Sequence, residues 1–333
     1  MSRKIGIDLG TANALVYVPK KGIIINEPSV VAVDMIDNKV LAVGKEAQVM
    51  IGRTPDGIKA VRPIRDGVIA DYRMTEALIG YFLRKVGGPV RFFKPDCLIS
   101  VPAAITSTEK RAVTEVALNV GARNAYVAKE PILAALGAGI AIEEPSGSMI
   151  VDIGGGTTEV AVISLGGVVS FASSRTAGDK LTEAIVNHVK KKYGLAIGDQ
   201  SAEDIKYKIG SALPVEKDSM DIRGRDVVSG LPKNVTISSE EVTIAMQNEL
   251  REIVQTVKNV LQDTPPELAS DIIEKGIVIT GGGALLKNID ELIARSTGVP
   301  TSITDDPLYA VAKGTGIMLD GIEKFKRALQ QKR

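Results

Sequence analysis

Apolar, β-branched runs that end in glycine-rich turns are the clearest pattern in this chain. Residues 149–153 read Met-Ile-Val-Asp-Ile, the turn Gly154-Gly155-Gly156 follows, and an alternating run restarts at residues 160–163. A strand that ends in such a turn and restarts at once predicts a β-hairpin. Backbone N–H groups in a turn without side chains can approach a phosphate closely. By itself the turn leaves open whether it binds a ligand or only solves a steric problem.

The same order of residues occurs near the start of the chain. An apolar run at residues 5–9 contains Asp8, the turn Gly10-Thr11-Ala12-Asn13 follows, and an alternating run restarts at residue 14. A third glycine turn, at residues 280–284, follows an apolar run and leads towards a helix. Two similar hairpins, one opening each half, predict two related half-domains that face each other.

Helical periodicity predicts the elements between these strands. A helix is expected from Thr75, as its N-cap, to Gly87. Capping boxes are expected at residues 106–109 and 238–241, the second opening one helix that ends before Pro265. Residues 322–329 predict a short basic amphipathic helix docked on the first domain.

Two helices rich in small residues are also predicted, at residues 130–139 and 310–316. Pro131 suits the first turn of the earlier one, and small side chains let a helix pack closely against a neighbour. Glu130 stands at the entrance of that helix, where a carboxylate caps a helix as readily as it serves in catalysis. Residues 193–232 predict a polar, loop-rich insertion with a short helical start at 202–206.

Composition limits the classes of function. The chain has 333 residues, 44% hydrophobic and 24% charged, which predicts a globular protein of two domains. A net charge of +1 and 4% aromatic residues give neither a basic field nor stacking platforms for nucleic acid. The single Cys97 excludes an internal disulfide, and no apolar run approaches the roughly 20 residues of a membrane span. With no signal peptide recognised, a soluble cytoplasmic protein is expected.

Together these features stand in the order of the ATPase fold shared by actin, Hsp70 and sugar kinases. Within that group the chain resembles the bacterial actin MreB/Mbl family along essentially its whole length. The strings that carry the resemblance are Gly6-Ile7-Asp8-Leu9-Gly10-Thr11-Ala12-Asn13, Asn26-Glu27-Pro28-Ser29-Val30, Asp66-Gly67-Val68-Ile69-Ala70-Asp71, Asp152 to Thr158, and Thr264-Pro265-Pro266-Glu267-Leu268.

The resemblance implies an α/β, actin-like two-domain ATPase, in which each domain has a ribonuclease-H-like mixed sheet and a smaller inserted subdomain. Domain I is expected at residues 1–137, with a small subdomain at about 33–65, completed by C-terminal helices at about 312–333. Domain II is expected at residues 138–311, with a small subdomain at about 181–242. ATP and Mg²⁺ would lie in the cleft between the two hairpins.

The resemblance also implies roles for single residues. Asp8 and Asp152 would hold Mg²⁺ through water, since this ion is usually bound by few carboxylates plus waters and phosphate oxygens. Glu130 and Thr157 would position and polarise the attacking water. The expected phosphate contacts are Gly10, Thr11, Ala12, Asn13, Gly154, Gly155, Gly156 and Thr157. The expected nucleoside contacts are Glu203, Lys206, Gly281, Gly282, Gly283 and Ala284.

Two features need separate expectations. Lys129 stands before Glu130, where the family often has an acid, and is expected to lower the pKa of Glu130 and weaken it as a base. Phe92 and Phe93 lie between Arg91 and Lys94. These aromatic residues either fold back onto the core or form an exposed wedge for anionic lipid, and the family's membrane-insertion loop favours the wedge.

The function expected from the resemblance is a filament-forming bacterial actin that supports cell shape, with slow ATP hydrolysis coupled to filament turnover. Its partners would be copies of itself, through antiparallel pairing at Thr108 and Glu109, the inner face of the cell membrane, and membrane proteins of cell-wall morphogenesis. Two alternatives of the same fold remain. A phosphotransferase of the sugar-kinase type would need a catalytic aspartate for the acceptor, and a chaperone-type ATPase would need a further substrate domain.

Overall fold

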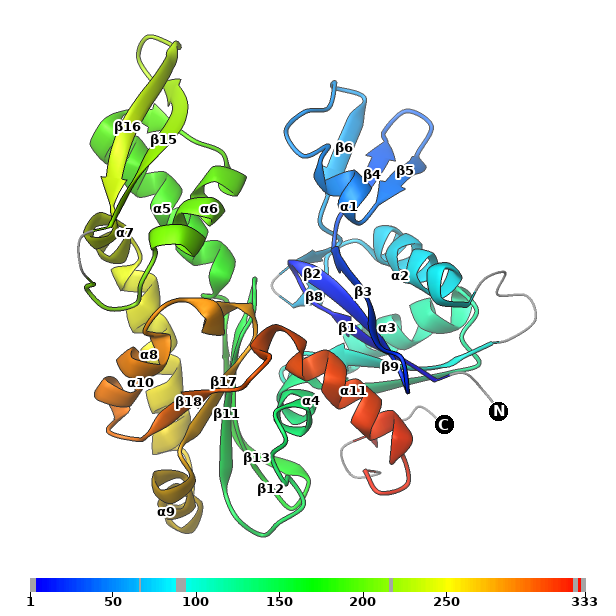
Figure 1. The fold of residues 1–333 in the computed structure, drawn as a ribbon. Helices are drawn as coiled ribbons and strands as arrows, with labels where there is room; N and C mark the ends of the chain where they lie inside the picture. The colour runs from blue at the N-terminus through cyan, green and yellow to red at the C-terminus, as the bar shows by residue number, and fades with distance from the viewer. Residues whose placement is uncertain (1–3, 66, 88–93, 216–217, 326–328, 331–333) are drawn as a thin grey trace.

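Two mixed β-sheets organise the molecule, each at the centre of one lobe (Figure 1). The computed structural model describes residues 4–65, 67–87, 94–215, 218–325 and 329–330. The sheet of the first lobe has the order β19-β10-β9-β1-β2-β3, formed by Leu329–Gln330, Asn124–Lys129, Asp96–Val101, Lys4–Leu9, Asn13–Val18 and Gly22–Pro28. The sheet of the second lobe has the order β13-β12-β11-β17-β18, formed by Gly167–Ser174, Thr158–Ser164, Ser148–Ile153, Ile277–Thr280 and Thr301–Ile303.

The two sheets repeat one pattern of strand pairing. In the first lobe β1 is antiparallel to β2 and parallel to β9, which is parallel to β10. In the second lobe β11 is antiparallel to β12 and parallel to β17, which is parallel to β18. The predicted hairpins close at the pairs Leu9–Ala14 and Ile153–Thr158. Both hairpins and the relation between the two halves are therefore confirmed.

Helices cover both faces of each sheet, which explains why the central strands are buried on both sides. Every residue of β9 and β11 is buried. Helices α2 and α3 cover the outer face of the first sheet and share one hydrophobic core with it. Helices α5, α8 and α10 cover the outer face of the second sheet and share another. The bounds of these helices are Tyr72–Gly87, Ser107–Asn119, Gly178–Tyr193, Gln247–Gln262 and Ile289–Thr297.

The predicted small-residue helices, α4 (Glu130–Gly137) and α11 (Ala310–Asp320), cross each other between the two sheets. A side chain at Gly137 would collide with the carbonyl oxygen of Ala310, and one at Gly314 with that of Leu133. Glycine is therefore required for the backbones to approach this closely. The crossing joins the lobes beneath the cleft, in a third hydrophobic core that includes Met318.

Smaller units stand at the same end of both lobes and give the molecule a U shape (Figure 1). On the first lobe, β4 (Val31–Asp34), β5 (Lys39–Val43) and β6 (Ile58–Val61) form a small sheet beside α1 (Lys45–Gln48). On the second lobe, β15 and β16 form a hairpin beside α6 and α7. Their bounds are Ser219–Asp226, Pro232–Ser238, Asp199–Ile209 and Ser239–Ala245.

Some predicted helix ends are wrong. Helix α2 begins at Tyr72, because the Asp71 side chain accepts a hydrogen bond from the Met74 N–H (2.9 Å), and Thr75 is buried inside the helix. The expected capping boxes at Thr106 and Ser238 are confirmed. The second box opens only α7, however, and the chain passes through Met246 before α8 begins.

Two longer segments also differ from expectation. The insertion at residues 193–232 is not mainly loop, since it contains α6 and β15. The C-terminal segment does not form the expected amphipathic helix within its described part. After α11 the chain turns, and β19 pairs with β10 at the edge of the first sheet.

Candidate functional site

A cleft of about 310 Å³ lies between the lobes, at the open side of the two sheets. Its wall combines both hairpin turns, the start of α4, one face of α6 and the turn after β17. The expected site residues that line it are Asp8, Gly10, Thr11, Ala12, Asn13, Glu130, Asp152, Gly154, Gly155, Gly156, Thr157, Glu203, Lys206, Gly281, Gly282 and Gly283. Ala284 is different, because it is buried behind the turn and does not line the cleft.

The two hairpin turns meet across the lobes. A Cβ atom at Gly155 would lie 2.7 Å from Cβ of Ala12, and one at Gly156 would lie 2.7 Å from Oγ1 of Thr11. Neither position therefore has room for a side chain. Thr11 Oγ1 also accepts a hydrogen bond from the Gly67 N–H (3.1 Å), so the first turn is held in place. The turns form a preorganised backbone cradle of the kind that suits phosphates.

Two aspartates lie at the floor of this cradle. Asp8 Oδ1 accepts a hydrogen bond from Ser100 Oγ (2.9 Å), and burial nevertheless raises the pKa of Asp8 to about 6. Burial raises the pKa of Asp152 to about 7, and the nearby charge of Asp8 adds to this shift. Buried carboxyl groups with raised pKa values are a favourable place for a cation, which would stabilise their charged forms.

The donor set fits Mg²⁺ held partly by other ligands. Within the described residues, no group of three or more histidine, cysteine, aspartate or glutamate side chains could hold a metal ion alone. Mg²⁺ normally keeps several waters and takes one or two carboxylates together with substrate phosphates. Asp8 and Asp152 in a phosphate-sized cradle fit that requirement.

Glu130 enters the cleft from the first turn of α4. Burial raises its pKa well above the usual value, and the charges of Glu159, Asp8 and Asp152 raise it further. The expected lowering by Lys129 is therefore wrong. The Lys129 ammonium points elsewhere, 5.4 Å from the centre of the Phe171 ring. A raised pKa makes the Glu130 carboxylate a stronger proton acceptor than a solvated glutamate.

Glu159 belongs to the same group of acids and was missed by the sequence reasoning. It pairs with Asp152 across the β11–β12 hairpin and is buried. Both carboxylate oxygens accept from the Ala103 N–H of the other lobe, at 3.0 and 3.1 Å. Burial raises its pKa to about 8, against the opposing effects of the Ala103 hydrogen bond and Lys129. The detectable signal was an acid directly before the apolar run at residues 160–163, in a hairpin whose short turn places it opposite Asp152.

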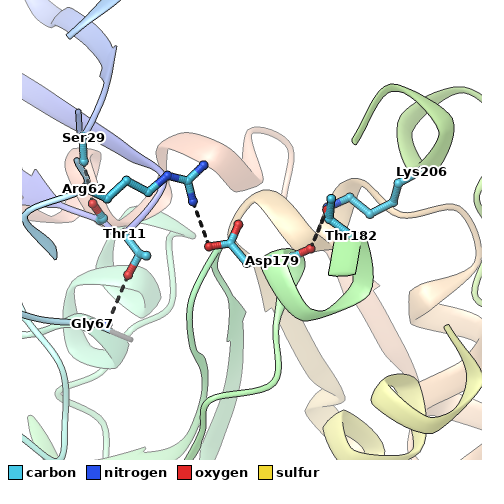
Figure 2. A network of polar contacts seen from close by, with 9 residues as sticks. Thr11, Ser29, Arg62, Gly67, Asp179, Thr182 and Lys206 are labelled. Atoms are coloured by element: carbon cyan, nitrogen blue, oxygen red, sulfur yellow. Dashed lines mark hydrogen bonds and ion pairs between the residues drawn. The ribbon is translucent and has the colours of Figure 1, made fainter. Parts of the chain in front are cut away.

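The other end of the cleft suits a nucleoside. Lys206 on α6 donates to the Gly178 carbonyl oxygen and to Thr182 Oγ1, both at 2.8 Å, so its ammonium is held at the wall (Figure 2). Glu203 lies one turn earlier on the same helix. Side chains that the sequence did not single out complete this part of the lining, among them Leu181, Tyr207, Leu285, Leu286 and Leu308. Mixed apolar and charged walls of this kind fit a base and a ribose.

The remaining expected residues lie outside the cleft lining. Thr108 is exposed on the first turn of α3. Glu109 accepts from the N–H and the hydroxyl of Thr106, at 2.9 and 2.7 Å, and therefore caps this helix. Phe92 and Phe93 fall outside the described residues. In the described parts of the chain, no helix has the length and apolar character needed to cross a bilayer.

Comparison with known sequences gives a consistent result. The profile of the MreB/Mbl protein family matches residues 2–327. The cell shape-determining protein Mbl of Bacillus cereus is 51% identical over 331 residues, covering 99% of both chains. The cell shape-determining protein MreB of Escherichia coli is 48% identical over 329 residues, covering 97% of this chain and 94% of that protein.

Solved structures show the same relation. MreB5 of Spiroplasma citri bound to AMPPNP superposes with a TM-score of 0.93 at 40% identity, covering 98% of each chain. The same protein has also been solved bound to ADP, with a TM-score of 0.93. The MamK double helical filament, at 21% identity and a TM-score of 0.80 over 96% of this chain and 99% of that one, shares the fold. The fold of the present chain is thus actin-like.

Proposed function

Because this chain belongs to the MreB/Mbl protein family, we propose that it is a nucleotide-dependent, filament-forming bacterial actin that supports cell shape. A bacterial actin cytoskeletal role is supported by relatives that are named cell shape-determining proteins. The observation that carries the proposal is the cleft, in which two duplicated hairpin turns and two aspartates meet between the lobes.

The proposed ligand is ATP with Mg²⁺. The related MreB5 structures contain AMPPNP and ADP, which supports nucleotide binding in the corresponding cleft. The backbone of the two hairpin turns would receive the phosphates, while Glu203, Lys206 and the turn at Gly281, Gly282 and Gly283 would contact the nucleoside. Asp8 and Asp152 would hold Mg²⁺ through water, and the ion would neutralise charge on the phosphates.

Hydrolysis is proposed to depend on Glu130 and Thr157. Both line the cleft wall at the second hairpin turn. Backbone N–H groups of the turns, that of Thr157 included, would hold the phosphates, which leaves the Glu130 carboxylate and the Thr157 hydroxyl free to act on water. Glu130, with its raised pKa, would accept a proton from the attacking water, and the Thr157 hydroxyl would orient that water. Slow hydrolysis coupled to assembly would then limit the lifetime of the polymer.

We further propose antiparallel double protofilaments that pair through α3 and lie on the inner face of the cell membrane. Phe92 and Phe93, with Arg91 and Lys94 beside them, are proposed to insert into anionic lipid. Burial of one phenylalanine contributes about 1.5–3 kcal/mol, so a single subunit would bind weakly and a filament strongly.

Liposome flotation tests the membrane part. Filaments of the parent protein should rise with vesicles that contain anionic lipid, and unassembled protein should remain below. The variant Phe92→Ser/Phe93→Ser should form filaments that no longer float. If those filaments still rise like the parent, another segment holds the membrane.

Sedimentation with electron microscopy tests the proposed function itself. Purified protein with ATP and Mg²⁺ should pellet as filaments, while protein with EDTA and no nucleotide should remain in the supernatant. The two alternatives of the same fold predict no pellet. Transfer of phosphate to a sugar panel, without filaments, would replace the cytoskeletal proposal with the phosphotransferase.

A further inference from the structure

One ion pair crosses from lobe to lobe at the border of the cleft. Arg62 follows β6 of the small sheet in the first lobe, and Asp179 is the second residue of α5 in the second lobe. Arg62 Nη1 lies 3.0 Å from Asp179 Oδ2, with the two side chains 37% and 44% exposed. Figure 2 shows the guanidinium reaching over from the first lobe to the carboxylate. Asp179 lines the cleft, so the pair stands beside any molecule that enters it.

The Asp179 end of this pair is attached to the second hairpin turn. The Asp179 N–H donates to the Gly155 carbonyl oxygen (2.8 Å), and the Gly178 N–H donates to that of Gly154 (3.1 Å). Lys206, a proposed nucleoside contact, donates in turn to the Gly178 carbonyl oxygen. The start of α5 therefore cannot move away without disturbing the turn that is proposed to hold the phosphates.

The Arg62 end is attached to the first hairpin turn through a short segment. The next residue, Pro63, accepts hydrogen bonds at its carbonyl oxygen from the N–H groups of Ala70 and Asp71, at 2.9 and 3.2 Å. Within the loop so closed, the Gly67 N–H donates to Thr11 Oγ1 (3.1 Å), as Figure 2 shows. Each end of the ion pair is thus connected to the glycine turn of its own lobe.

The charge balance of the cleft gives the pair a second effect. Its lining contains Asp8, Glu130, Asp152, Asp179 and Glu203, but among the described lining residues only Lys206 is basic. A nucleotide adds further negative charge. Without Arg62, the carboxylate of Asp179 would be unpaired at the border of this acidic cleft and would repel the ligand.

We propose that Arg62 and Asp179 form a latch that holds the lobes together over a bound nucleotide and slows its exchange. The inference rests on the proposed function, because it concerns release of that ligand. Separation of the small units of the two lobes would open the cleft, and the helix crossing of α4 and α11 lies at the opposite, closed side (Figure 1). Opening around that crossing requires the ion pair to break.

The half-exposed position sets the size of the effect. A solvent-exposed ion pair typically contributes little free energy. Removing one is therefore expected to change a rate that depends on breaking it by about two- to fivefold. Screening by salt weakens such pairs further. The latch is therefore expected to slow nucleotide exchange without preventing it. This fits a subunit that must exchange its nucleotide between rounds of assembly.

The test measures release of a fluorescent ATP analogue, chased by excess ATP, at protein concentrations too low for sedimentation. The variants are Arg62→Ala, Asp179→Asn and the two combined, with Arg53→Ala as the control. Arg53 is also exposed on the small unit of the first lobe and forms no ion pair among the described residues. Arg62→Ala should release the analogue about two- to fivefold faster than the parent, and Arg53→Ala at the parent rate.

A double-mutant cycle separates the latch from direct contacts of Asp179 with the ligand. If the latch exists, Arg62→Ala should have little further effect once Asp179 is Asn, and added salt should accelerate the parent towards the rate of Arg62→Ala. Equal release from the parent and Arg62→Ala, or fully additive effects, would overturn the latch while nucleotide binding stands. A parent protein that binds no analogue at all would overturn the proposed function together with the latch.

Discussion

Four neighbouring acidic side chains, two buried and two half-buried at the cleft wall, are the most unusual feature at the scale of single residues. Asp8, Glu130, Asp152 and Glu159 all have pKa values raised mainly by burial, and neighbouring carboxylates raise three of them further. Burying acids next to one another destabilises a fold unless something compensates for their charge. The arrangement is understandable if a divalent cation and its bound phosphates complete the site.

The roles proposed for Glu130 and Thr157 can be tested separately from binding. Glu130→Gln and Thr157→Val each keep the approximate shape of the side chain but remove the proton acceptor or the hydroxyl. Release of phosphate should fall roughly 10²-fold or more in each variant, while affinity for ATP should change little. Unchanged phosphate release in both variants would show that neither group acts on the water.

Glu159 makes a prediction about the pH dependence of stability. Its folded pKa of about 8 lies above the usual 4.5, so between these values the folded protein keeps a proton that the unfolded chain has released. The free energy of unfolding therefore falls as pH rises through this window. Glu159→Gln removes the titration, and the nucleotide-free variant should gain stability relative to the parent, increasingly from about pH 5 to pH 8.

Thermal unfolding in EDTA at a series of pH values measures this difference. The matched control is Glu46→Gln, which changes an exposed glutamate of α1 and should follow the parent curve at every pH. A constant offset between parent and Glu159→Gln across the series would mean that Glu159 is already charged in the folded protein at pH 5.

Among single residues, the sequence predicted those site residues that can be recognised from their neighbours along the chain. Asp8 and Asp152 could be found because each stands two residues before the first glycine of a turn. Glu159 could not be found by that rule, since its position beside Asp152 depends on hairpin register and its contact with Ala103 on the meeting of two lobes. The expectation for Lys129 failed because neighbouring residues at a strand–helix junction point in different directions.

At the scale of elements, local hydrogen bonds determine where some helices start. Tertiary packing determines the other element boundaries and how the elements are arranged. The capping boxes at Thr106 and Ser238 were predictable because every participating group lies within four residues. The break at Met246 carries no proline or glycine signal, and β19 needs a partner strand about 200 residues away. The small-residue helices were predictable as elements, but their crossing follows only from the fold.

The structure also changes the design of a test for α3 as the pairing surface. Replacement of Glu109 would remove its half of the capping box and cost about 0.3–1.5 kcal/mol, so lost pairing could reflect a frayed helix. Thr108→Arg leaves the cap in place and puts a bulky charge on an exposed position. Micrographs should show single instead of paired filaments for Thr108→Arg, at unchanged melting temperature. Paired filaments of normal width would mean that the contact lies elsewhere.

At the scale of the whole molecule, two lobes of one topology face each other across a cleft and are joined at one side. The duplication was visible in the sequence as two similar hairpins. The U shape came from resemblance, because composition and periodicity do not determine how two half-domains are placed. The exact domain boundaries remain predictions. If both lobes contact one nucleotide, as proposed, its state would set the angle between them and thereby control assembly.

The most direct test of the central claim is steady-state phosphate release measured against protein concentration, in ATP and Mg²⁺. A filament-forming ATPase should release little phosphate below a critical concentration and increase linearly above it, with the break at the concentration where the protein begins to sediment. Glu130→Gln should still sediment while its phosphate release stays low. A straight line through the origin, with no break and no pellet, would show an ATPase that works as a single subunit and would contradict the account.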